Sequence, residues 1–363
     1  MLLVEADGKA LFRQAGIAVP PGAESPGPWM VKAQVPAGGR GKAGGVARCA
    51  DATAVSAAVA HQLTLRIKGH RVESCLVEQA VTGAERYLAL MLDPAAYAVR
   101  VLFAAEGGVD IEQAGTIAFR LCPPEPDAIT AAIADLVSAE PDTWRQALID
   151  TGHRLAHLML DAELMLAEIN PLFVSAQGCI AGDAKVVVDL NAIDRQPAIA
   201  ALLRARPQTY ADAVRKLDEG FDYVELDPNG EVGLVTTGAG LSMMLVDEMT
   251  ARGMKPLNFL DIRTGQLRGS PARLIRVLEW IAAAPRVKVV LVNIFAGITD
   301  LGEFARLLAD AIQATPALRV PIVARLVGRG AAEARRVLAN RMPGLIVEED
   351  LDAALAHVAG YTK

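Results

Sequence analysis

Two hydrophobic patterns follow one another along the chain. Up to about residue 192, short runs in which apolar and polar side chains alternate, such as VKAQV at 31–35, predict strands, and longer segments such as 52–66 and 127–160 predict helices. A polar connection marked by Pro197 and Pro207 then covers 193–220. The change of pattern across this connection predicts an α/β chain with one domain on each side of it.

From residue 232 onward, predicted strands and helices alternate regularly. The strands are expected at 232–236, 257–262, 287–293, 320–326 and 345–347, each followed by a helix. This order predicts a parallel sheet with helices on both faces, and such sheets bind ligands beyond the carboxyl ends of their strands. Glycine-rich turns follow the first, third and fourth strands at that edge. They predict a second site there, although close packing of the backbone explains the same glycines equally well.

The first part of the chain is organised around Trp29–Gly45, WMVKAQVPAGGRGKAGG. This stretch predicts a strand, a basic turn with five glycines and a second short strand. Glycines let a backbone approach a ligand closely, and the N–H groups that they expose cradle phosphate oxygens. Lys32 is expected to point off the first strand beside the turn, where its ammonium neutralises phosphate charge. A solvated hairpin with surface charges is the alternative.

Two better-known phosphate motifs do not fit this stretch. The loop G-x-x-x-x-G-K-[ST] fails because Pro36 replaces its first glycine and Ala43 replaces the Ser or Thr. Gly39, Gly41 and Gly44 spell G-x-G-x-x-G, but a dinucleotide-binding loop must open a helix, and VARC follows here. We therefore expect two strands that close as a flap over nucleotide phosphates.

A second polar pattern lies in the apolar hairpin predicted at Leu164–Val188. If its turn centres on Ala176–Gln177, Asn170 lies directly across from Asp183, and Glu168 shares the strand face of Asn170. Two carboxylates and an amide oxygen then come together, and hard oxygen ligands of this kind suit Mg²⁺ held beside substrate phosphates. A hairpin with solvent-facing polar residues is the alternative.

Composition narrows the class of protein. The 363 residues allow two or three domains, and the net charge of −6 argues against a nucleic-acid or anionic-membrane protein. Aromatic residues make up 4%, which disfavours stacking platforms for single-stranded nucleic acid. We expect a cytoplasmic protein with reduced thiols, because no signal peptide is visible and no C-x-x-C pair occurs among the cysteines, Cys49, Cys75, Cys122 and Cys179.

An ordered series of motifs carries a family resemblance over nearly the whole chain. The series is VKAQVPAGGRGKAGG, LVEQA, EGGVDIE, LAEINPL, TTGAGLSM, NFLDI and VLVNIFAGI. In these motifs the sequence resembles the β subunit of succinyl-CoA synthetase and of related ADP-forming acid–CoA ligases, such as malate–CoA ligase. The resemblance implies an ATP-grasp domain over 1–210 with a flap subdomain near 20–81. It also implies a flavodoxin-like CoA-ligase domain with a parallel sheet over 211–363.

The resemblance also implies roles for particular residues. The nucleotide contacts would be Lys32, Gly39, Arg40, Gly41, Glu78 and Glu85. Asn170 and Asp183 would ligate Mg²⁺, in agreement with the hairpin argument, and Glu168 would act in catalysis by facing a phosphorylated histidine. That histidine belongs to a separate α subunit, which also binds most of the CoA, so an αβ or α2β2 assembly is implied. ATP or GTP, Mg²⁺ and CoA are the implied cofactors and co-substrates.

The expected chemistry activates a carboxylic acid with ATP. ATP phosphorylates the partner's histidine or directly feeds an acyl phosphate, the acid takes the phosphoryl group, and the CoA thiolate then displaces phosphate. Because a lysine beside a phosphate loop is not a packing residue, we expect Lys32→Ala to weaken nucleotide binding with little loss of thermal stability. Two other hypotheses for the function are a nucleotide-binding subunit without ligase activity and an ATP-grasp ligase that joins a carboxylate to an amine.

The chain departs from the family in the loops that bind the acid. Thr236-Thr237 replaces Val-Asn, Arg263-Thr264-Gly265 replaces three glycines, and Thr299-Asp300-Leu301 replaces an arginine–cysteine segment. The implied substrate contacts are Thr237, Gly297, Ile298 and Thr299, to which we add Arg263, whose guanidinium pairs well with a carboxylate or phosphate. A solvent-exposed arginine is the alternative for Arg263. These departures put succinate itself in doubt as the acid.

Overall fold

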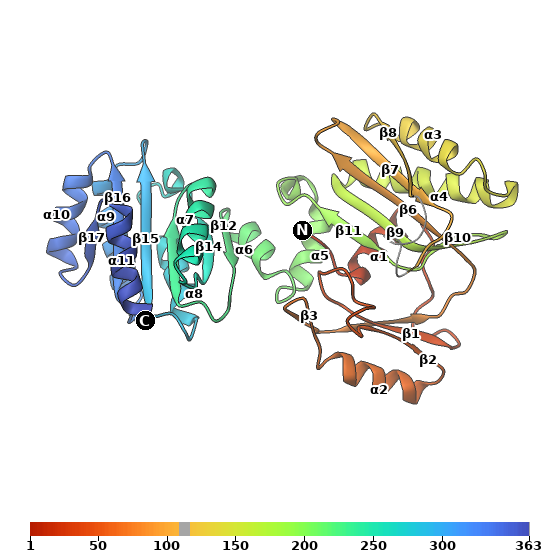
Figure 1. Cartoon of the computed structure of the whole chain (residues 1–363), viewed down its shortest axis with the longest axis horizontal. Helices are drawn as coiled ribbons and strands as arrows, with labels where there is room; N and C mark the ends of the chain where they lie inside the picture. The colour runs from red at the N-terminus through yellow and green to blue at the C-terminus, as the bar shows by residue number, and fades with distance from the viewer. Residues whose placement is uncertain (109–116, 363) are drawn as a thin grey trace. The chain divides into compact units, whose positions relative to one another are not determined.

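The computed structural model describes residues 1–108 and 117–362, and the chain divides into two compact units (Figure 1). Unit 1 is Met1–Thr209 and unit 2 is Tyr210–Lys363. Part of the glycine-containing turn expected at 106–112 lies outside the described residues. The two units are described separately below.

Unit 1 begins with a helix and a small antiparallel sheet of order β2–β1–β5. Successive residues of the alternating pattern face opposite sides of this sheet, so Val31 and Ala33 pack on one face and Lys32 points to the other. Asp51 caps the helix Ala52–Gln62, which follows β2, by accepting a hydrogen bond from the N–H of Ala54 at 2.8 Å. The elements are α1 (Glu5–Gln14), β1 (Trp29–Ala33), β2 (Val46–Cys49), α2 (Ala52–Gln62), β3 (Arg66–Ile67), β4 (His70–Arg71) and β5 (Cys75–Gln79).

A larger antiparallel sheet of order β10–β9–β6–β7–β8, with β11 also paired to β9, forms the rest of unit 1. Alternate residues of β7, Val99, Val101 and Phe103, are buried, and α3 and α4 lie along the sheet (Figure 1). The elements are β6 (Ala84–Asp93), β7 (Ala98–Ala104), β8 (Ala118–Cys122), α3 (Pro126–Leu136), α4 (Asp142–Asp161), β9 (Leu164–Ser175), β10 (Gly178–Ala181), β11 (Lys185–Val188), the 3-10 turn Ile193–Arg195 and α5 (Pro197–Ala205).

Unit 2 contains the parallel sheet that the strand–helix alternation predicts, in the order β13–β15–β16–β17. Its apolar strands are covered on one face by α8, α9 and α10 and on the other by α7 and α11. The elements are α6 (Ala211–Glu219), β12 (Asp222–Glu225), β13 (Val232–Thr236), α7 (Ala239–Ala251), β14 (Asn258–Asp261), the 3-10 turn Thr264–Gln266, α8 (Ala272–Ala283), β15 (Val289–Ala296), α9 (Leu301–Ala314), β16 (Ile322–Gly328), α10 (Ala331–Arg341), β17 (Ile346–Glu348) and α11 (Leu351–Thr362).

The structure corrects the sequence expectation at one edge of this sheet. β14 was expected as an ordinary parallel strand, but it pairs along its length with β12, antiparallel. Toward β13, backbone hydrogen bonds form at the two ends of the expected strand, from the Leu257 N–H to the Val232 carbonyl at 2.8 Å and from the Ile262 N–H to the Thr236 carbonyl at 3.0 Å. Between these ends the side chain of Asn258 links the strands, accepting from the N–H of Leu234 at 2.9 Å and donating to the Leu234 carbonyl at 3.0 Å. The amide group thus replaces a backbone partner in the sheet, which a hydrophobic pattern does not predict.

The connection expected over 193–220 also differs from the prediction, because it holds two helices, α5 and α6. Pro197 occupies the first turn of α5, where a missing N–H costs nothing, so it starts a helix rather than breaking one.

Within residues 1–108 and 117–362, no helix is both long and apolar enough to cross a lipid bilayer.

Candidate functional site

The glycine-rich segment between β1 and β2 folds into a tight turn. Gly39 and Gly44 have backbone φ angles of +79° and +76°, a region that favours glycine, and the N–H of Gly45 donates to the carbonyl of Arg40 at 2.9 Å. A Cβ atom added at Gly38 or Gly41 would meet nothing within 4 Å. The turn therefore exposes bare backbone and leads into a strand, as the flap interpretation requires.

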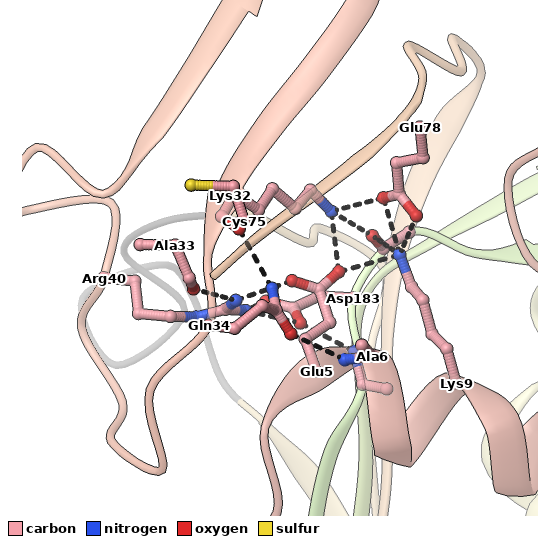
Figure 2. A network of polar contacts seen from close by, with 12 residues as sticks. Glu5, Ala6, Lys9, Lys32, Ala33, Gln34, Arg40, Cys75, Glu78 and Asp183 are labelled. Carbon is pink, nitrogen blue, oxygen red and sulfur yellow. Dashed lines mark hydrogen bonds and ion pairs between the residues drawn. The ribbon is translucent and has the colours of Figure 1, made fainter. Parts of the chain in front are cut away.

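Behind this turn lies a cluster of oppositely charged side chains, which Figure 2 shows. It joins α1, β1, the glycine-rich turn, β5 and the segment after β10. The anionic members are Glu5, Glu78 and Asp183, and the cationic members are Lys9, Lys32 and Arg40. The formal charges of these six side chains cancel. We call this set the charged cluster.

The two lysines of the charged cluster share the same acceptors. Lys32 Nζ lies 2.8 Å from Glu5 Oε1, 2.7 Å from Glu78 Oε1 and 2.6 Å from the carbonyl of Gly182. Lys9 Nζ lies 2.6 and 2.7 Å from the two oxygens of Glu78, and it also contacts Glu5 and the Gly182 carbonyl. Helix α1 and strand β5 are thereby fastened to the segment that carries Asp183.

Arg40 connects the flap turn to the predicted metal ligand. One nitrogen of its guanidinium donates to both oxygens of Asp183, at 2.8 and 2.9 Å, and the other lies 2.7 Å from Glu5 Oε2. The Ala33 carbonyl accepts a further hydrogen bond from Arg40 at 3.1 Å. A residue predicted to bind phosphate and a residue predicted to bind magnesium therefore bind each other in this structure.

The charged cluster favours the ionised forms of Glu5 and Lys32. Burial alone would raise the pKa of the Glu5 carboxyl, but Lys32, Lys9 and Arg40 together hold that pKa well below its usual range. Burial alone would lower the pKa of Lys32, and the carboxylates of Glu5, Glu78 and Asp183 raise it above its usual value instead. The cluster thus offers fixed positive charge beside a glycine-rich turn.

Lys32 differs from the sequence expectation in one respect. It faces α1 rather than open solvent, and 7% of its surface is exposed. Because its ammonium is held by two buried carboxylates, removing it leaves three carboxylates and only two cations, Lys9 and Arg40, in the charged cluster. The expectation that Lys32→Ala leaves thermal stability nearly unchanged is therefore wrong on physical grounds.

The predicted hairpin register is present on both sides of the predicted metal ligand. Gly178 lies opposite Ser175, and Lys185 lies opposite Glu168, so the same register sets Asp183 across from Asn170. The side chains have other partners, however. The Asn170 amide exchanges two hydrogen bonds with the backbone of Gly108, at 2.7 and 2.9 Å, and Glu168 lies 3.1 Å from Lys185 Nζ.

The remaining predicted nucleotide contact, Glu85, lies at the start of β6 beside Gly108, since a Cβ added at Gly108 would come within 3.1 Å of its carboxylate. Across residues 1–108 and 117–362, no three Asp, Glu, His or Cys side chains are grouped closely enough to hold a metal ion alone. The predicted metal ligands are therefore an amide and a carboxylate that would share the ion with a phosphate-bearing substrate.

Sequence reasoning missed Glu5 and Lys9 in α1. Both are almost completely buried, and they form an i,i+4 ion pair at 2.7 Å. Their spacing on the buried face of a short helix, beside Leu11 and Phe12, was the available signal. A buried ion pair on an apolar helix face usually has partners elsewhere, which here are Lys32, Glu78 and Arg40.

In unit 2, the predicted acid-binding residues lie at the carboxyl ends of neighbouring strands. Thr237 follows β13, and Gly297, Ile298 and Thr299 follow β15, with 93% of Ile298 exposed. The guanidinium of Arg263 lies 2.9 Å from Asp222 Oδ2, so this arginine is paired within its own unit. Its proposed contact with the acid or phosphate stays a prediction, and it requires the guanidinium to exchange Asp222 for the ligand.

Comparison with known proteins gives matches in both halves of the chain. Residues 3–174 match the ATP-grasp domain family, and residues 235–359 match the CoA-ligase family. The chain is 33% identical to the β subunit of an ADP-forming succinate–CoA ligase from Desulfurococcus amylolyticus, with 99% of this chain and 98% of the relative covered. The corresponding subunit from Chloroflexus aurantiacus is 36% identical over 95% of this chain and 94% of its own length.

Solved structures show the same architecture. The ATP citrate lyase from Methanothrix soehngenii, solved with citrate and coenzyme A, superposes with a TM-score of 0.72. The alignment covers 96% of this chain and 95% of that one at 17% identity. At this identity the likeness concerns the fold alone.

Proposed function

The chain belongs to the family of ADP-forming succinate–CoA ligase β subunits, and on that premise we propose that it activates a carboxylic acid with ATP for transfer to coenzyme A. The observation that carries the proposal is the contact of Arg40 with Asp183 and Glu5 beneath the glycine-rich turn. This contact brings a permanent positive charge from the flap turn next to the carboxylate that is predicted to bind the metal.

The nucleotide phosphates would be held by the flap turn and its cations. The backbone at Gly39 and Gly41 approaches the phosphates, and Lys32 and Arg40 neutralise their charge. Arg40 is the residue that must move, because its guanidinium exchanges the carboxylate of Asp183 for phosphate oxygens. Lys32 would stay paired with Glu5 and Glu78 and would contribute a fixed positive charge from the interior side of the turn.

The oxygen donors at Asn170 and Asp183 fit Mg²⁺. The ion accepts one or two protein carboxylates or amides and completes its shell with phosphates and water, so a larger acidic group is not needed. When bound, Mg²⁺ neutralises charge on the transferring phosphoryl group. Asp183 would become available to the ion if Arg40 turned to the phosphates. Asn170, whose amide oxygen accepts a hydrogen bond from the Gly108 N–H in this structure, would offer the remaining lone pair of that oxygen from the facing strand.

Such a site would activate a carboxylic acid by giving it a phosphoryl group and by stabilising the charge that develops during the transfer. A carboxylate is a poor electrophile until it carries a phosphoryl leaving group, and the cleavage of ATP supplies that group. Lys32 and Arg40 stabilise the charge that spreads over the phosphoryl oxygens during transfer. Glu168, on the strand face of Asn170, would face the histidine that receives the phosphoryl group.

That histidine would lie on a separate α subunit, which would also bind most of the CoA. The support is the membership of this chain in a family of β subunits. The acid would contact Thr237 and the loop Gly297–Thr299 of unit 2, and the replacement of family residues in these loops leaves succinate as one candidate among several.

The test is CoA-dependent ADP release. The full chain is co-expressed with an α-like subunit, and the complex is screened with ATP, Mg²⁺, CoA and a panel of small carboxylic acids. We expect ADP release that requires both CoA and one acid and that is absent for either subunit alone. ADP release by this chain alone, with an amine in place of CoA, would contradict the proposal and support a carboxylate–amine ligase.

A further inference from the structure

The short hairpin of β3 and β4 is packed against the flap turn, residues 38–45. Its residue Ile67 is 1% exposed and lies in one apolar cluster with Ala33, Val35 and Val72. A Cβ added at Gly45, at the end of the flap turn, would come within 2.7 Å of Ile67 Cδ1, so a residue without a side chain is needed there. The hairpin is therefore held at a fixed place beside the flap turn.

This packing brings Lys68 over the glycines of the flap turn. Lys68 and Gly69 form the tip of the hairpin, with backbone φ angles of +48° and +86°. A Cβ added at Gly39 would lie 3.8 Å from both Cε and Nζ of Lys68. Since Lys68 is exposed, its ammonium lies on the solvent side of the backbone that is proposed to approach the phosphates.

The flap turn has unused hydrogen-bond donors at this place. The N–H groups of Ala43, Gly44 and Gly45 donate back to carbonyls of the turn. Those of Gly39 and Gly41 donate to no acceptor among the described residues. Water can satisfy such exposed groups, so the charge around them decides whether an anion binds there instead.

The charges around the flap turn distinguish Lys68 from the cations behind it. The charged cluster holds three carboxylates and three cations, so it contributes little net attraction for an anion that arrives from solvent. Lys32 and Arg40 each contact two of these carboxylates. Lys68, in contrast, forms no ion pair with any carboxylate in residues 1–108 and 117–362. It therefore adds an uncompensated positive charge beside the free N–H groups.

We propose that Lys68 is a further phosphate-binding residue, which holds the triphosphate of the nucleotide from the solvent side while the flap turn and the charged cluster hold it from the interior side. The inference rests on the proposed nucleotide site of unit 1. A lysine suits this position because its ammonium carries three donors on a flexible stem. Unlike Arg40, Lys68 gives up no carboxylate when it pairs with phosphate oxygens.

The test is ATP binding by the full chain, measured by calorimetric titration in the presence of Mg²⁺. We expect Lys68→Gln to weaken ATP binding by about fivefold, and Lys68→Arg, which keeps the charge, to stay within about twofold of the wild type. The difference between Lys68→Gln and the wild type should narrow as the salt concentration rises, because salt screens an exposed ion pair.

Thermal unfolding separates phosphate binding from a structural role. Because Lys68 has no carboxylate partner among the described residues, we expect Lys68→Gln to unfold at the wild-type temperature in the absence of ATP. The rise in unfolding temperature that ATP causes should be smaller for this variant than for the wild type, because a more weakly bound ligand stabilises the folded state less.

Arg71→Gln is the matched control, because it removes one positive charge from the same hairpin. Arg71 pairs with Arg66, the neighbour of buried Ile67, and thus lies on the face of the hairpin that points away from the apolar cluster. Its side chain is 69% exposed and lies 3.8 Å from Glu73. We expect this variant to bind ATP within about twofold of the wild type.

The outcomes separate this inference from the function on which it rests. ATP binding that Lys68→Gln leaves unchanged, or that both glutamine variants weaken equally, overturns the inference alone. So does a fall in the unfolding temperature of Lys68→Gln that is as large without ATP as with it. Absence of ATP binding by the wild-type chain overturns the nucleotide site and the inference together. Absence of CoA-dependent ADP release by the complex, with the Lys68 dependence of ATP binding retained, overturns the ligase function alone.

Discussion

At the scale of single residues, burial changes what a lysine does. Lys32 is expected from the sequence to point off its strand beside a phosphate loop, and the structure places its ammonium between Glu5 and Glu78 in the interior. It therefore stabilises the fold and supplies positive charge to the proposed phosphate site. One side chain serves both purposes because a buried lysine paired with carboxylates stays protonated.

Replacing Lys32 should consequently affect stability as well as nucleotide binding. We expect Lys32→Met, which keeps the length of the side chain, to lower the free energy of unfolding by about 3–5 kcal/mol, the usual cost of leaving buried charges unpaired. Urea denaturation of the full chain measures this. The control is Arg71→Ala in the same flap subdomain, where the side chain is 69% exposed and 3.8 Å from Glu73, and where we expect a change below about 0.5 kcal/mol. Equal stabilities of the two variants would show that the buried pairing of Lys32 contributes nothing.

At the scale of elements, the contact of Arg40 with Asp183 joins the flap turn to the segment after β10. Arg40 from the turn occupies both oxygens of Asp183, so a metal bound at Asp183 would have to compete with the guanidinium for this carboxylate. Metal binding at Asp183 would release Arg40 to the phosphates, and phosphate binding at Arg40 would release Asp183 to the metal. Such mutual release is a positive coupling between two ligands, which must be reciprocal.

Removing Arg40 should separate the two effects. In the absence of nucleotide, we expect Arg40→Ala to bind Mn²⁺, a probe for Mg²⁺, about tenfold more tightly than the wild type, because Asp183 is then free. The measurement is electron paramagnetic resonance of the unbound Mn²⁺. The double variant Arg40→Ala/Asp183→Asn should lose this gain. A gain that persists in the double variant would mean that Mn²⁺ responds to the charge of the cluster and not to release of Asp183.

The elements that the sequence predicts well are those whose signals are local. Helix α9 follows β15 as the strand–helix alternation predicts, because Asp300 caps it, accepting from the N–H of Glu303, and because its apolar positions repeat at helical spacing. The role of Asn258 was not predictable, because a side chain that replaces a backbone partner between strands depends on tertiary pairing. The same limit explains why Glu5 and Lys9 were missed, since sequence spacing shows an ion pair and not its burial.

At the scale of the whole molecule, two units carry different parts of one proposed reaction. Unit 1 holds the charged cluster, and unit 2 holds the loops proposed to bind the acid. The motifs for unit 1 and the strand–helix repeat of unit 2 predicted the fold class, which the family matches confirm. The roles of the individual site residues stay predictions, because they depend on ligands and on a partner subunit.

The most direct test of the central claim, that the charged cluster is the magnesium–nucleotide site, is calorimetric titration of the full chain with ATP, with and without Mg²⁺. For the wild type we expect Mg²⁺ to strengthen ATP binding by about tenfold or more, because Asp183 shares the ion with the phosphates. Asp183→Asn keeps the shape of the side chain and removes an anionic ligand, and it should bind ATP with little dependence on Mg²⁺ while unfolding thermally close to the wild type. An Asp183→Asn variant that retains the full wild-type dependence on Mg²⁺ would contradict the account.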